Sequence, residues 1–336
     1  MSATDTTPAR RHIPNRLDKP LRSAIFSWEA LLVTVVVAIF IVNSFASPYF
    51  LDVWSLSDLT FNFTEKGLIA LAMALLIISG EIDLSVAAII ALASTLMGMA
   101  AQVGVDTPGL VLIGVGVGFV CGAFNGLLVT GLGLPSIVVT IGTMSLFRGT
   151  AFIILGDQAY KGYPASFAFF GQGYVWWVFS FELALFALAA AVYWFVLHRT
   201  SFGRRIFAIG NNAVAAQFSG VRVGRIKFIL FCLTGLMSGI AAVLITSRLG
   251  STRPSIAQGY ELEVITMVVL GGVSILGGAG SILGVVLAAL IMGLVTFGLG
   301  LLNVPGIVMS IFIGLLLILV IALPILWGRF SRRRLA

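Results

Sequence analysis

The stretch SILGVVLAALIMGLVTFGLGLLNVPGIV, residues 281–308, decides the fold class because it contains no ionisable side chain. A helix needs about 20 mostly apolar residues to cross the roughly 30 Å hydrocarbon core of a bilayer. The stretch lies inside a longer region, between Glu263 and Arg329, that has no Asp, Glu, Lys or Arg. A second such region lies between Asp106 and Arg148. Each region is long enough for several membrane-spanning helices.

Composition supports the same class. The chain has 336 residues, of which 59% are hydrophobic and 10% are charged, unlike a soluble globular protein. A membrane β-barrel would instead show alternating segments of about 10 residues. The net charge of +7 comes from basic residues clustered in three places, which favours membrane topology over nucleic-acid binding. We therefore predict an all-α integral membrane protein.

Apolar runs bounded by Gly, Pro, Asn and charged residues predict about ten transmembrane helices. They are expected at residues 28–46, 59–79, 84–102, 110–130, 136–155, 175–197, 228–246, 262–276, 282–302 and 307–327. The predicted transmembrane domain covers 28–327. It lies between an N-terminal tail, 1–27, which does not resemble a cleaved signal peptide, and a basic C-terminal tail, 328–336.

Orientation follows from the positive-inside rule. Basic residues gather in the N-terminal tail, in the loop 199–227 and in the C-terminal tail. An even number of spans places all three on the cytoplasmic side. The sequence therefore predicts a multi-pass protein with both termini in the cytoplasm.

Two segments resemble each other. GLLVTGLGLPSIV (126–138) and GLVTFGLGLLNVPGIV (293–308) each join consecutive predicted spans, and the two turns should face opposite sides of the membrane. This pattern is typical of an inverted-topology repeat, which is common in transporters. Chance similarity between Gly- and Leu-rich helices is the alternative.

Two carboxylates, Glu81 and Asp83, interrupt the apolar sequence IISGEIDLSVAA (77–88). A break between two helices leaves backbone groups that need partners. Asp83 is expected to cap the next helix, and direct contact with a transported molecule is the alternative. Either way, this stretch is a candidate helix break or translocation pathway.

Two further polar residues lie within predicted spans. Asn125 is expected either to brace neighbouring helices or to line a pathway. Arg148 is the one basic residue well inside an apolar block, which makes it a candidate for the translocation pathway; the alternative is a buried ion pair with Glu81, Asp83 or Glu65. Nearby, Gly114, Gly118 and Gly122 are spaced to form a helix-packing face.

The sequence has no motif for ATP binding, metal binding or catalysis. No Gly-Lys-Ser/Thr phosphate loop occurs, so the chain is not expected to bind ATP by that route. Cys121 and Cys232 lie in apolar blocks without metal-ligand spacing. No nucleophile and base constellation suggests an enzyme, and the chain is expected to bind no cofactor or metal.

Four motifs occur in the order seen in the permeases of ribose-type sugar ABC importers, and the chain resembles that family from about 61 to 324. They are GEIDLS, FNGLLVTGLGLPSIVVTIGTMSLFRG, GRRIFAIGNNAVAAQFSGV and GYELEVITMVVLGGVSILGGAGS. Two positions depart from the family pattern: Glu81 and Asn211 each stand where the family more often has Gly. The character of residues 79–98 is closest to the rhamnose and autoinducer-2 branch.

The resemblance implies a type II ABC importer-like permease in a bacterial inner membrane. It would form a homodimer or pair with a paralogue, contact an ATPase subunit that uses ATP and Mg²⁺, and receive a sugar from a periplasmic binding protein. The resemblance assigns ATPase coupling to a partner-facing helix within loop 199–227. Its residues are Arg204, Arg205, Gly210, Asn211, Asn212, Ala215, Ala216, Gln217 and Gly220. The rival hypothesis is an ion-coupled secondary transporter.

Overall fold

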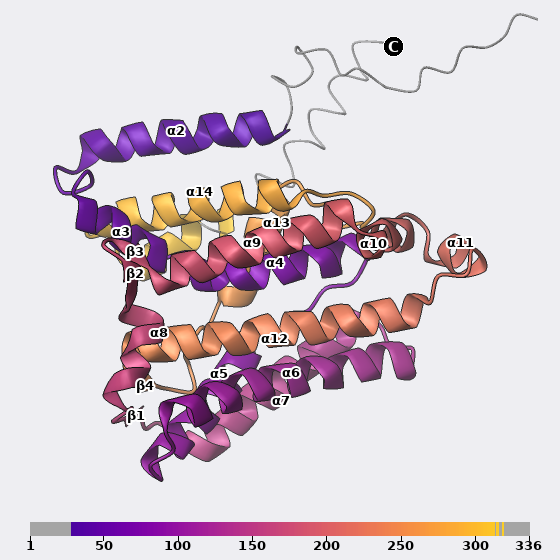
Figure 1. Cartoon of the computed structure of the whole chain (residues 1–336), viewed down its shortest axis with the longest axis horizontal. Coiled ribbons are helices and arrows are strands. Elements are labelled where there is room, and N and C mark those ends of the chain that lie inside the picture. Colours follow the sequence, from indigo (N-terminus) through magenta and orange to yellow (C-terminus); the bar gives the residue numbers. More distant parts are fainter. Residues whose placement is uncertain (1–27, 313, 316–317, 319–336) are drawn as a thin grey trace, which may run out of the picture.

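The computed structural model describes residues 28–312, 314, 315 and 318. Helices run roughly side by side along one direction, and short strands and turns gather at their ends (Figure 1). We call the end that carries α10 and α11 the loop end, and the opposite end, which carries β2 and β3, the hairpin end. Both predicted tails lie outside the described residues.

The longer helices are α2 (Trp28–Ala46), α4 (Thr64–Ile78), α5 (Val86–Gln102), α6 (Thr107–Gly131), α7 (Ser136–Leu155), α9 (Phe181–Arg199), α12 (Val223–Leu249) and α14 (Ile282–Leu301). The shorter helices are α3 (Val53–Phe61), η1 (Ala165–Ala168), α8 (Phe169–Gln172), α10 (Ser201–Asn211), α11 (Ala213–Phe218) and α13 (Tyr260–Leu270). Antiparallel strands β1 (Tyr160–Lys161) and β4 (Ser251–Thr252) pair with each other, as do β2 (Tyr174–Trp176) and β3 (Phe179–Ser180).

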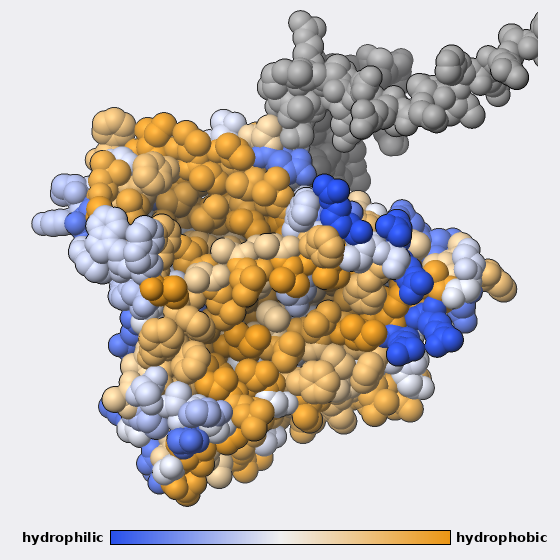
Figure 2. Space-filling model, viewed as in Figure 1, coloured by the Kyte–Doolittle hydropathy of each residue, from blue (hydrophilic) through white to orange (hydrophobic). Residues whose placement is uncertain are grey.

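Helix α4 is the centre of the bundle. Every one of its residues except Lys66 is buried, and it packs against α12, α13, α9 and α14. A helix that is apolar on all sides is expected to be surrounded by other elements. By contrast, α2, α6, α7 and α9 expose wide apolar faces. In Figure 2 these hydrophobic surfaces occupy the middle of the molecule, and hydrophilic residues gather toward the two ends.

Helices α6 and α12 pack closely against each other through glycines on both helices. A Cβ added to Gly118 would overlap the carbonyl oxygen of Gly235, and one added to Gly122 would overlap that of Phe231. A Cβ on Gly114 would meet the side chains of Met97 and Val243. The predicted packing face is thus confirmed, since small residues allow membrane helices to approach closely.

This contact gives a first prediction. Gly118→Ala should destabilise the folded protein by about 1–3 kcal/mol, because the added methyl group overpacks an interface of backbone against backbone. Gly116→Ala is the matched control, because it lies on the same helix and its Cβ would meet no atom within 4 Å. Thermal stability of the two purified variants measures the difference. Equal stability would show that the contact is not tightly packed.

The described part of the chain contains fewer membrane-spanning helices than the ten predicted. Among the described residues, six helices are long and apolar enough to cross a membrane, and the bent pair α3 and α4, which turns by 44°, gives a seventh. Helix α5 has 17 residues and α13 has 11. Helical structure resumes at Gly306, but most of the predicted span 307–327 lies outside the described residues. The figure of about ten is therefore a loose count of apolar helices.

Several predicted boundaries were wrong. Residues 174–180 form the β2–β3 hairpin, so the sixth span starts at Phe181, where the Ser180 hydroxyl accepts a hydrogen bond from the amide of Leu183. The aromatic hairpin has the composition of a span but turns at Trp177, whose φ is +45°. Helix α12 begins at Val223, which shortens the predicted loop 199–227.

The two similar turns lie at opposite ends of the bundle, as predicted. The end of α6 reaches the loop end, where Thr130 faces Gly224 at the start of α12. The end of α14 reaches the hairpin end, where Phe297 and Leu301 pack around the cluster of Phe50, Leu59 and Leu294.

Candidate functional site

The break between α4 and α5 lies at the loop end. Helix α4 stops after Ile78, and Gly80 has a φ of +86°, a conformation that favours glycine. Asp83 is fully buried, and its Oδ1 accepts hydrogen bonds from the Ser85 amide at 2.8 Å and the Ser85 hydroxyl at 2.6 Å. Ser85, not Asp83, occupies the N-cap of α5. The predicted cap was therefore wrong by two residues: Asp83 instead fixes the residue that precedes the helix.

Asn125 connects α6 to this break. Its Nδ2 donates to the Ser85 hydroxyl at 2.8 Å and to Oδ2 of Asp83 at 3.4 Å, and its side chain is fully buried. Its Oδ1 has no hydrogen-bond partner among the described residues. This geometry corresponds to the brace rather than to a pathway lining.

Glu81 and Arg148 do not form a pair. Glu81 forms an ion pair with Lys227 near the start of α12, and the two side chains are 13% and 19% exposed. Arg148 instead donates through Nη1 to the carbonyl oxygens of Pro254 and Ile256, both at 2.7 Å. All three proposed ion-pair partners of Arg148 were thus wrong. The reason is that Arg148 lies far along α7 from the break, beside the segment that follows β4.

A double-variant cycle checks the corrected pair. Glu81→Gln and Lys227→Gln should each destabilise the chain by about 1–3 kcal/mol, because each leaves a partly buried charge without its charged hydrogen-bond partner. The double variant should lose less than the sum of the two. Combining Glu81→Gln with Arg148→Gln should give additive losses. Additive losses for Glu81 and Lys227 would contradict the pair.

The predicted coupling loop folds into two short helices, α10 and α11, which are joined at Asn212. The Thr200 side chain caps α10 by accepting a hydrogen bond from the Gly203 amide. The Asn212 side chain caps α11 by accepting a 2.9 Å hydrogen bond from the Ala215 amide. Gly220, with a φ of +83°, follows α11. Threonine and asparagine are preferred at such caps because their side chains accept bonds from free backbone amides.

Helix α10 is attached to the end of α4. A Cβ on Gly210 would overlap the carbonyl oxygen of Ile78, so only glycine allows this approach. The side chain of Asn211 donates to the carbonyl oxygen of Gly278 at 3.3 Å, and the amide of Gly278 donates to Ile78 at 2.9 Å. The end of α4, α10 and the loop 271–281 therefore form one connected unit, immediately before the helix break.

The outward surface of the two helices differs from the predicted one. Ala216 is buried, and Gly210 lies against the carbonyl oxygen of Ile78 at the end of α4. Val214 and Phe218 are 64% and 89% exposed and form an apolar tip that sequence reasoning missed. The other predicted residues that are exposed are Arg204, Arg205, Asn211, Asn212, Ala215, Gln217 and Gly220.

A second ionic cluster, also missed, lies at the hairpin end. The Arg248 side chain contacts Glu65 through Nε at 3.0 Å and Nη2 at 3.1 Å, and its Nη1 donates to the carbonyl oxygen of Phe61 at 2.9 Å. Close by, the Thr64 hydroxyl donates to Glu182 at 2.7 Å. The cluster joins the beginnings of α4 and α9 to the end of α12. The presence of acidic and basic residues in apolar segments could have suggested an ion pair here. It could not have shown which residues form the pair.

Comparison with known proteins places the chain in a family. The model of a family described as branched-chain amino acid transport system / permease component matches residues 55–321. The chain belongs to this permease family. It is a multi-pass membrane protein, as its apolar helices indicate.

Individual relatives cover most of the chain. The autoinducer 2 import system permease protein LsrD of Salmonella paratyphi B is 34% identical over 307 residues, which are 88% of this chain and 91% of that protein. The ribose import permease protein RbsC of Bacillus subtilis is 37% identical over 285 residues, which are 84% of this chain and 88% of that protein. No solved structure matches significantly.

Proposed function

We propose that this chain is the membrane-spanning permease subunit of an ABC importer that carries a monosaccharide or a closely related polyol across a bacterial inner membrane. The observation that carries the proposal is the close contact of α10 with the end of α4, while Val214 and Phe218 form an exposed apolar tip. A connector needs one face fixed to the moving helices and another free for the motor subunit.

The energy source in this proposal is a separate ATPase subunit, which holds ATP and Mg²⁺. The tip of α10 and α11 contacts that subunit, and closure driven by the nucleotide moves α4 and the adjacent break. A periplasmic binding protein delivers the sugar at the hairpin end. A second copy or a paralogue completes the transport unit. The relatives that import ribose and autoinducer 2 support this proposal.

Charge at the two ends of the bundle supports the orientation. Five exposed arginines surround the loop end: Arg199, Arg204, Arg205, Arg222 and Arg225. Four exposed aspartates lie at the hairpin end together with Lys161 and Arg253: Asp52, Asp58, Asp106 and Asp157. The positive-inside rule then favours a cytoplasmic location for the loop end, and we propose the same side for both termini from the basic residues in their sequences.

Thiol labelling tests this orientation. In sealed cells, an impermeant reagent should label a cysteine introduced at Thr107 or Gln172 and should not label one introduced at Asn212. Labelling of Asn212→Cys from outside would reverse the orientation and remove the ATPase from its proposed surface.

The substrate within this class is proposed from sequence character, which is closest to the rhamnose and autoinducer-2 branch. Uptake of rhamnose, ribose and autoinducer 2 into proteoliposomes, with and without the ATPase subunit, tests the function. We expect uptake of one of these compounds only when the ATPase, ATP and binding protein are present. Uptake driven by a Na⁺ or H⁺ gradient without the ATPase would instead support the ion-coupled alternative.

A further inference from the structure

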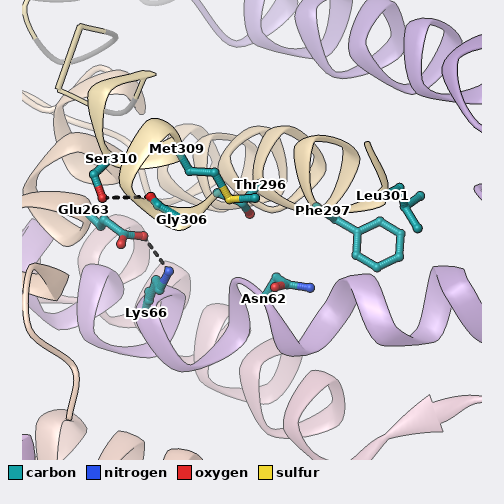
Figure 3. A pocket seen from close by; sticks show the side chains of 10 residues that line it. Asn62, Lys66, Glu263, Thr296, Phe297, Leu301, Gly306, Met309 and Ser310 are labelled. Atoms are coloured by element: carbon teal, nitrogen blue, oxygen red, sulfur yellow. Dashed lines mark hydrogen bonds and ion pairs between the residues drawn. The ribbon is translucent and has the colours of Figure 1, made fainter. Parts of the chain in front are cut away.

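A cavity of about 400 Å³ lies at the hairpin end, between the joint of α3 and α4, the start of α13, the second half of α14 and the residues that follow it. Asn62, Lys66, Glu263, Thr296, Phe297 and Ser310 contribute to its wall (Figure 3). Its volume lies in the roughly 300–1,000 Å³ range of small-molecule sites. The hairpin end is the outer end in the orientation proposed above.

An ion pair forms part of this wall. Lys66 Nζ lies 2.5 Å from Oε2 of Glu263, and the side chains are only 13% and 18% exposed. Lys66 is also the single residue of α4 that is not buried. Charges removed from water are costly even when they are paired. Ionisable residues within membrane segments therefore usually face a water-filled cavity or a substrate path.

The remaining polar groups keep unused hydrogen-bonding capacity. Asn62 donates through Nδ2 to the carbonyl oxygen of Asp58, while no bond to its Oδ1 occurs among the described residues. The hydroxyls of Thr296 and Ser310 donate to carbonyl oxygens within their own helices, which leaves their oxygens free to accept. Among the described residues, the ammonium group of Lys66 donates a hydrogen bond only to Glu263, and it lies 4.5 Å from the centre of the Tyr260 ring.

The charge and composition of the wall select a class of ligand. The paired charges cancel, so the cavity offers no net attraction to an anion or a cation. A neutral molecule with adjacent hydroxyls matches the site, because one hydroxyl can donate to Glu263 while another accepts from Lys66. The ring of Phe297 offers an apolar surface for the carbon skeleton of such a molecule.

We infer that this cavity is an outward-facing binding site for a small neutral polyol, of which monosaccharides are the main class. This inference rests on the proposed function, because the cavity would be the first site in the membrane domain that binds the transported sugar. Asn62, Lys66, Glu263 and Thr296 supply the hydrogen bonds. Lipid headgroups are the competing occupants, because the cavity also contacts Leu301 and Met309.

Direct binding to the purified full-length chain in lipid nanodiscs tests the inference without any ATPase. The probes are radiolabelled ribose, rhamnose, glucose and mannitol. We expect the wild-type chain to bind at least one of them. Thr296→Val should weaken that binding about threefold to tenfold, as expected for one lost hydrogen bond. Lys66→Met and Asn62→Leu should weaken it at least as much.

Thr266→Val is the matched control. The Thr266 hydroxyl also donates to the carbonyl four residues earlier, at 2.7 Å, but Thr266 does not line the cavity. Its binding should equal that of the wild type. The inference is overturned if none of the four probes binds, if Thr296→Val and Thr266→Val bind equally, or if mass spectrometry shows a phospholipid that Lys66→Met releases. If only this inference is wrong, the chain will not bind sugar in this cavity, but uptake will still require the ATPase. If the proposed function is wrong, uptake will not require the ATPase.

Discussion

Arg248→Gln is expected to destabilise the folded chain by about 3–5 kcal/mol, because it leaves the buried carboxylate of Glu65 without its charged partner. Glu65 is 1% exposed, and its Oε1 lies 3.0 Å from Nε of Arg248. Loss of the guanidinium further removes the hydrogen bond to the carbonyl oxygen of Phe61.

The measurement is the thermal or denaturant stability of the purified protein in one detergent. Arg253→Gln is the matched control, because Arg253 is exposed and should change stability by less than about 0.5 kcal/mol. Glu65→Gln combined with Arg248→Gln should regain at least half of the loss, since no unpaired charge then remains at Glu65. A double variant as unstable as Arg248→Gln would contradict this explanation.

Gly210→Ala should reduce transport roughly tenfold or more while the chain still inserts into the membrane. The new methyl group cannot occupy the space taken by the carbonyl oxygen of Ile78, so α10 must move away from the end of α4. Overpacking of this kind costs about 1–3 kcal/mol, which is enough to shift the docked arrangement by a factor of ten. Insertion should persist because the contact involves only the last residue of α4, together with Gly278 in the loop 271–281.

Gly224→Ala is the control for this variant. Gly224 also lies in the loop end, and its Cβ would meet its nearest neighbour, on Thr130, at 3.9 Å. ATP hydrolysis and sugar uptake should be measured together in proteoliposomes. We expect hydrolysis with little uptake for Gly210→Ala and wild-type behaviour for Gly224→Ala. Normal uptake by Gly210→Ala would mean that α10 transmits no movement through α4.

The sequence predicted those features that depend on apolar length and small-residue spacing. The long helices α6, α7 and α14 appeared close to their predicted positions because uncharged runs of that length have few other stable structures in a membrane. The glycine contact of α6 was predicted for a similar reason. Capping residues and glycines also indicated the helix break near Asp83.

Long-range pairing could not be predicted in this way. Glu81 pairs with Lys227, which is 146 positions away, and Glu65 pairs with Arg248, which is 183 positions away. Sequence spacing does not determine which helices are neighbours, so three acids remained possible partners of Arg148 and none of them pairs with it. The β2–β3 hairpin was missed because its Val, Trp and Phe residues continue without a charged residue into the apolar start of α9. The exposed tip at Phe218 depends on how α10 and α11 turn, which their amphipathic pattern leaves open.

The most direct test of the central claim is association with the ATPase subunit. We expect Val214→Asp combined with Phe218→Asp to prevent copurification of the ATPase with the permease, because the apolar tip then carries two charges. Val103→Asp is the control, because Val103 is 81% exposed at the hairpin end and should leave association unchanged. Copurification of the ATPase with the double variant at the wild-type level would contradict the assignment of α10 and α11 as the coupling element.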